Sequence, residues 1–142
     1  MELTILGCHS ATPRQNFHTT SQLLNFKNHL FMIDCGEGTQ IRLREEKINF
    51  SKIKHIFISH LHGDHFYGLI GLINTFKLLG RKVDLNIYGP LGIKEIILLQ
   101  MKLSKSRTEF KLIFFELEKK DPEVIFDDEL VKITTIPLKH RV

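Results

Sequence analysis

The sequence predicts an α/β layered fold. Short apolar runs rich in β-branched and aromatic residues alternate along the chain with longer amphipathic segments. Two further pairs of strand-like runs are separated by only a few polar residues, as in hairpins. Strands that alternate with helices, together with hairpins, are typical of a sheet covered by helices. At 142 residues, the chain is long enough to bury a core of its own.

The first part of the chain predicts four strands and one helix. Residues 2–7 and 21–26 are short strands, and a Lys-Asn turn joins the second of them to a strand over 29–36. Residues 36–48 have helical spacing, with a threonine near the start. The run 55–59 is apolar throughout, as expected of a strand that is buried on both faces.

The second part of the chain continues the alternation of strands and helices. Residues 66–80 have the length and apolar spacing of a helix that a glycine ends. A strand over 84–90, an amphipathic helix over 92–105 and a strand over 110–117 follow. Residues 123–138 predict a hairpin that turns at an Asp-Asp pair.

Composition narrows the class of protein. The chain is 42% hydrophobic and 25% charged, and it has neither a membrane-length apolar run nor a signal-type start, so we expect a cytoplasmic protein that does not span a membrane. Cys8 and Cys35 form no C-x-x-C pair, and we expect both to be small buried residues. The net charge of +4 permits a polyanionic partner without requiring one.

The segment "HLHGDH" is the strongest chemical signal in the sequence. His60 and His62 follow a strand and lie two residues apart, so both side chains can point the same way. Gly63 allows a sharp turn, after which Asp64 and His65 begin a helix. Imidazole and carboxylate ligands suit Zn²⁺ above all, with Mn²⁺ or Fe²⁺ as alternatives. We expect two adjacent ions and a hydrolytic site for phosphoesters, amides or thioesters.

His140 is the expected third imidazole of the first ion. It follows an apolar strand, as His60 does, and functional side chains gather at strand ends in α/β folds. The histidines His9, His18, His29 and His55 carry no such pattern, and we expect them to be ordinary surface or core residues.

These motifs resemble one known family. The segments "MIDCGEGTQIRL", "IFISHLHGDHFYGLIGLINTFKLLGR" and "LNIYGPLGI", with the strand before His140, are similar to ribonuclease Z of the metallo-β-lactamase fold superfamily. The resemblance implies an αββα sandwich and zinc-dependent endonucleolytic removal of the 3′ trailer from precursor tRNA, which leaves a 3′-hydroxyl. It also implies a homodimer.

The resemblance assigns a role to each candidate residue. His60, His62 and His140 would bind one zinc, and Asp64 and His65 the second. Asp64 would also handle the proton of the attacking water. Asp34 is either a carboxylate that orients the metal-binding loop or a strand-end turn residue, and the sequence alone favours neither.

The sequence departs from the family in two respects. The first loop reads "LGCHSA" where family members have a glycine-rich "LGTGAG"-like segment, which puts substrate contacts by this loop in doubt. The family is also about twice as long, so residues 1–142 resemble the N-terminal half of its domain. A bridging aspartate, a further histidine and a tRNA-gripping arm have no counterpart here, and we expect the 142 residues alone to be inactive.

Two alternatives stay open. One is a hydrolase of the same fold that acts on small phosphodiesters or aryl sulfates. The other is a non-catalytic module that binds a metal or a partner.

Overall fold

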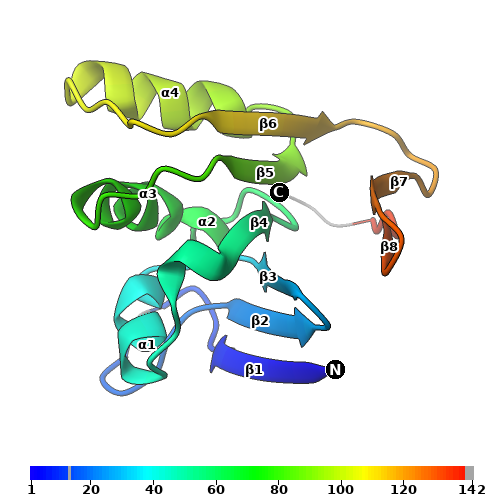
Figure 1. Ribbon diagram of the computed structural model, residues 1–142, viewed down its shortest axis with the longest axis horizontal. Coiled ribbons are helices and arrows are strands. Elements are labelled where there is room, and N and C mark those ends of the chain that lie inside the picture. Colours follow the sequence, from blue (N-terminus) through cyan, green and yellow to red (C-terminus); the bar gives the residue numbers. More distant parts are fainter. Residues whose placement is uncertain (13, 140–142) are drawn as a thin grey trace.

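The computed structural model describes residues 1–12 and 14–139, and a six-stranded mixed sheet is at its centre (Figure 1). Its strands are β1 (Glu2–Gly7), β2 (Ser21–Phe26), β3 (His29–Ile33), β4 (Ile53–Phe57), β5 (Leu85–Pro90) and β6 (Leu112–Leu117). They lie in sequence order: β1, β2 and β3 are antiparallel neighbours, and β3 to β6 run parallel. The predicted α/β class is confirmed.

Helices cover one face of this sheet (Figure 1). They are α1 (Thr39–Glu45), α2 (Gly63–Phe66), α3 (Leu69–Leu78) and α4 (Ile93–Leu103), with a short 3₁₀ turn η1 (Phe50–Lys52) before β4. In α4, Ile93, Ile97 and Met101 recur every four residues and form its buried stripe. These side chains pack over strand residues such as Ile56 and Ile87, neither of which is exposed to solvent. None of the helices in residues 1–12 and 14–139 is long and apolar enough to span a membrane.

Two predicted helices have different bounds in the structure. The segment 36–48 becomes helical only at Thr39, because Gly38 adopts a left-handed conformation with φ of 77°. The Thr39 hydroxyl donates to the carbonyl oxygen of Gly36 at 2.8 Å, so it does not cap the helix. The segment 66–80 is interrupted at Tyr67 and Gly68, where the backbone packs closely against residues 35–36.

The predicted hairpin packs on the face of the sheet opposite the helices (Figure 1). It consists of β7 (Val124–Asp127) and β8 (Lys132–Thr134). The Phe126 ring lies 5.4 Å from the ring of Phe31 and 4.8 Å from that of His55, centroid to centroid. At the turn, Oδ2 of Asp128 lies 2.7 Å from Nε2 of His29. The hairpin therefore contributes to a small aromatic and histidine cluster on this face.

The rest of this face is apolar and partly open. Phe57, Tyr88 and Phe115 form a stacked row on neighbouring strands, with centroids 4.6 Å apart at both steps. On the edge strand β1, Leu3 and Ile5 are 57% and 47% exposed. An apolar sheet face of this kind is suited to further packing.

We predict that His55 makes the stability of the fold depend on pH. Burial lowers its pKa to about 4 from an ordinary 6.5, and the positive fields of His29 and Lys54 add to this effect, while Asp128 opposes it. Because the folded state disfavours the charged ring, the neutral ring contributes fully to the free energy of unfolding above pH 6.5. This contribution is lost as the pH falls toward 4. With a half-exposed ring, we expect a loss of roughly 1–2 kcal/mol.

Urea unfolding at a series of pH values measures this loss. His55→Phe keeps an aromatic ring without a titrating group, so its stability should fall less between pH 6.5 and 4. An identical pH dependence in the two proteins would contradict the prediction.

Candidate metal centre

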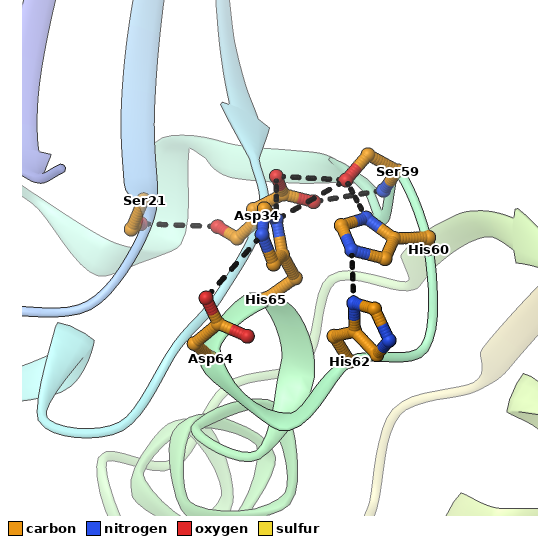
Figure 2. A network of polar contacts seen from close by, with 7 residues as sticks. All are labelled: Ser21, Asp34, Ser59, His60, His62, Asp64 and His65. Carbon is orange, nitrogen blue, oxygen red and sulfur yellow. Dashed lines mark hydrogen bonds and ion pairs between the residues drawn. The ribbon is translucent and has the colours of Figure 1, made fainter. Parts of the chain in front are cut away.

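The predicted histidine cluster forms where β3 and β4 end (Figure 2). Asp34 directly follows β3, and His60 comes three residues after the end of β4. His62 precedes the first turn of α2, which carries Asp64 and His65. Because β3 and β4 are parallel neighbours, their carboxyl ends bring these two loops together.

Four of the predicted ligand residues lie in one cluster. The ring centroids of His60 and His65 are 4.0 Å apart, and those of His60 and His62 are 4.7 Å apart. Nε2 of His60 lies 2.9 Å from Nδ1 of His62. Oδ2 of Asp64 lies 3.6 Å from Nε2 of His65. All four residues are partly buried, so the cluster is accessible from solvent.

Asp34 connects the two loops. Its buried carboxylate accepts from the backbone N–H of Ser59 at 2.7 Å, and its other oxygen lies 2.7 Å from Nδ1 of His65 and 3.0 Å from Oγ of Ser59. Its φ of 58° is left-handed, a conformation that aspartate tolerates better than most residues. Ser21 donates to its carbonyl oxygen at 3.0 Å. Asp34 is thus a turn residue whose side chain also holds His65.

Two glycines allow these loops to approach α2 closely. The Gly68 N–H donates to the carbonyl oxygen of Cys35 at 2.9 Å, and the Cys35 N–H donates to that of His65 at 2.7 Å. A Cβ on Gly68 would lie 2.0 Å from the carbonyl oxygen of Gly36. A Cβ on Gly36 would lie 2.3 Å from the carbonyl oxygen of Asp64. This contact leaves no local pattern in the sequence because its partners are about thirty residues apart.

The two cysteines differ from each other. Cys35 is buried as predicted, and burial raises the pKa of its thiol to about 12, so it stays protonated at neutral pH. Cys8 is exposed, and the expectation of burial was wrong for it. It lies in the loop after β1, where the chain has left the sheet.

The basic segment around α1 forms a separate feature. Arg44 and Lys47 line a pocket of about 410 Å³ near η1, at the end of β4 opposite the histidines. Arg81 also lines it, but its guanidinium donates to the carbonyl oxygens of Phe50, Val83 and Asp84 and stabilises the local fold. Arg42 pairs with Glu45 and Glu46, which reduces the positive charge of this segment.

The donor set fits a divalent cation only in part. Imidazole nitrogens and a carboxylate are the ligands that Zn²⁺ and similar ions use. Two nitrogens on one tetrahedral zinc lie about 3.3 Å apart, and the 2.9 Å between His60 and His62 is near that separation. Across residues 1–12 and 14–139, no three His, Cys, Asp or Glu side chains converge on a single metal position. His140, the predicted third imidazole, lies outside the described residues.

The topology and the clustered histidines define the class of protein, which is that of the metallo-β-lactamase fold. The crystal structure of human tRNase Z, short form (ELAC1), superimposes with a TM-score of 0.92 and 32% identity, over 100% of this chain and 62% of that one. The metallo-β-lactamase fold protein YhfI from Bacillus subtilis matches with a TM-score of 0.60 at 22% identity, which supports the fold alone. The fold that these neighbours share implies metal ions in general.

Residues 1–142 match the family model described as Anti-Pycsar protein Apyc1, and the chain belongs to this family. Curated relatives confirm the predicted resemblance to ribonuclease Z. The ribonuclease Z of Bacteroides thetaiotaomicron is 51% identical over 141 residues, which are 99% of this chain and 45% of that protein. The ribonuclease Z of Porphyromonas gingivalis is 41% identical over 97% of this chain and 45% of its own length. The chain spans about half the length of these relatives.

We predict opposite effects on stability for two glycine substitutions near the cluster. Gly68→Ala places a methyl group against the backbone of Gly36 and should destabilise the fold by about 1–3 kcal/mol. Gly71→Ala, within α3, meets only the side chain of Gln40 at 3.5 Å and should be neutral or stabilise by up to about 1 kcal/mol. Urea unfolding of both variants measures the difference, and equal stabilities would contradict this account of Gly68.

Proposed function

We propose that this chain is the histidine-bearing N-terminal half of a zinc-dependent endoribonuclease. The complete enzyme would remove the 3′ trailer from precursor tRNA in the cytoplasm and leave a 3′-hydroxyl. One combined observation supports the proposal: the cluster at the ends of β3 and β4 lies in a chain that is 51% identical to a ribonuclease Z over 141 residues.

His60, His62 and His140 would hold one zinc ion, and Asp64 and His65 the second. When bound, a pair of such ions supplies an activated water and stabilises charge on a phosphate oxygen. The 2.9 Å between Nε2 of His60 and Nδ1 of His62 supports their assignment to one ion, and Asp64 lies 3.6 Å from His65.

The protein side chains would orient the groups and manage the proton. Asp34 would keep His65 in one orientation, because its carboxylate contacts Nδ1 and leaves Nε2 directed toward Asp64. The Asp64 side chain is only 12% exposed, yet it lies in a cluster open to solvent. It could accept the proton of an attacking water and later return it to the leaving oxygen.

A bridging aspartate, a further histidine and a tRNA-binding arm would lie in the other half of the enzyme. The relatives named ribonuclease Z are about twice as long as the matched region, which leaves room for these groups. By itself, the 142-residue chain would hold the second ion with only Asp64 and His65. We therefore propose that these residues alone do not process tRNA at a useful rate.

A second candidate is a hydrolase of the same fold that acts on small phosphodiesters or aryl sulfates. The matching family model is named for an anti-Pycsar protein rather than for a tRNA nuclease, and this difference supports a substrate other than tRNA. The same imidazole and carboxylate set would serve either substrate. A non-catalytic metal-binding module is the third alternative.

We predict that the full-length protein, loaded with Zn²⁺ or Mn²⁺, cleaves precursor tRNA at the 3′ trailer. Activity only on bis-p-nitrophenyl phosphate would support the small-phosphodiester alternative, and activity on neither would support a non-catalytic module. His60→Ala in the same protein should reduce turnover by at least about 10²-fold, as for loss of one preorganised catalytic group. Residues 1–142 alone should be far less active, and single-turnover rates within tenfold of the full-length protein would contradict that expectation.

We also predict that the 142-residue chain self-associates, as the homodimer implied by the resemblance to ribonuclease Z suggests. The open sheet face and the edge strand β1 expose Leu3 and Ile5, and such surfaces associate in water. Light scattering at tens of micromolar should show a dimer or larger species. Leu3→Lys should reduce association, whereas Leu78→Lys, on a residue that is 75% exposed on α3, should not. A monomeric chain would contradict the prediction, and a loss of association only in Leu78→Lys would place the contact on the helices.

A further inference from the structure

Ser59 belongs to the polar network at the candidate metal centre and contacts Asp34, His60 and His65 (Figure 2). Its Oγ lies 3.0 Å from Oδ2 of Asp34 and 3.0 Å from Nδ1 of His60. A third neighbour, Nδ1 of His65, is 3.3 Å away. The backbone N–H of Ser59 already donates to the other carboxylate oxygen of Asp34, so the residue is fixed beside that group.

The ionised carboxylate determines the direction of the hydrogen bonds around Ser59. Asp34 can only accept, so both of the groups that contact its Oδ2 must donate. His65 therefore carries its proton on Nδ1, and the single hydroxyl proton of Ser59 is directed to Asp34.

The Ser59 oxygen then has only lone pairs to offer to His60. The 3.0 Å contact is a hydrogen bond only if Nδ1 of His60 carries the proton and donates it. The opposite arrangement would direct the hydroxyl proton to His60 and leave two oxygen lone pairs facing each other across the 3.0 Å to Asp34.

We propose that Ser59 is a positioning residue that transmits the orienting effect of Asp34 to His60. One buried carboxylate thus sets the tautomer of two imidazoles: His65 directly, and His60 through the serine hydroxyl. Both rings keep their proton on Nδ1 and have an unprotonated Nε2. We call this chain of contacts from Asp34 through Ser59 to His60 the relay. It describes the metal-free protein, and its link to metal binding rests on the proposed function.

Substitution of Ser59 by alanine separates a positioning role from a purely structural one. Its side chain is exposed, so removal of the hydroxyl leaves no buried cavity and the Ser59→Ala chain should fold. Backbone contacts would survive the substitution, since the N–H still donates to Asp34. The substitution removes the hydroxyl that contacts both Asp34 and His60.

The tautomers can be read directly by long-range ¹H–¹⁵N correlation NMR of the metal-free full chain, labelled at histidine, at a pH where the imidazoles are neutral. We expect His60 and His65 to show a protonated Nδ1 and an unprotonated Nε2. Ser59→Ala should give a mixture of tautomers at His60 and leave His65 unchanged. Ser59→Thr, which keeps the hydroxyl, should restore the single tautomer. Ser104→Ala, whose hydroxyl donates to the carbonyl oxygen of Met101 in α4, is the control.

Metal affinity gives a second readout that needs no RNA cleavage. Competition with a chelator should show Zn²⁺ bound about 10- to 100-fold more weakly by Ser59→Ala, the range typical of loss of a group behind a metal ligand. Ser59→Thr should bind nearly as tightly as the unsubstituted protein. A protonated Nε2 on His60 in the unsubstituted chain, or a tautomer that Ser59→Ala leaves intact, would overturn the relay whether or not the protein cleaves tRNA. Correct tautomers without weaker zinc binding would confine the relay to the metal-free state and remove its link to metal binding.

Discussion

The arrangement of the candidate metal centre depends on one buried carboxylate. Asp34 lies between the end of β3 and the loop after β4, and its two oxygens contact one backbone N–H, one hydroxyl and one imidazole. Without this acceptor, Nδ1–H of the partly buried His65 and the N–H and hydroxyl of Ser59 would lose their partner. The same contacts that hold the two loops together therefore orient the histidines.

The sheet places this carboxylate beside the histidines. Parallel pairing of β3 with β4 places both strand ends at one edge, and α2 begins directly beyond that edge. Close backbone packing of Gly36 and Gly68 then fixes α2 against the turn that contains Asp34. Histidines that are adjacent in sequence become a cluster because the strands, the turn and the helix are rigidly joined.

Most of the fold could be predicted from the sequence because its elements follow simple periodicities. The strand β4 is a continuous apolar run, and α4 buries residues spaced by four, so local composition was sufficient. The candidate metal ligands could be proposed from the sequence because four of them lie within six positions of the chain. Their ligand roles stay predictions, as does that of His140.

Other features depend on contacts between distant segments and left no local signal. Nothing near Gly68 indicates that its N–H donates to the carbonyl oxygen of Cys35, at the point where the predicted helix is interrupted. Packing of Phe126 against His55 was likewise unpredictable from either segment. Ser59 was missed because serine before a histidine is common, and its importance appears only with Asp34 beside it.

The central claim is that imidazole and carboxylate groups at the ends of β3 and β4 form a metal centre. Anomalous diffraction from crystals of the zinc-loaded full-length protein tests it most directly. The account predicts a zinc ion about 2.0–2.1 Å from imidazole nitrogens that include Nε2 of His60. A protein that takes up zinc only at other groups, such as the exposed thiol of Cys8, with the histidine cluster empty, would contradict it.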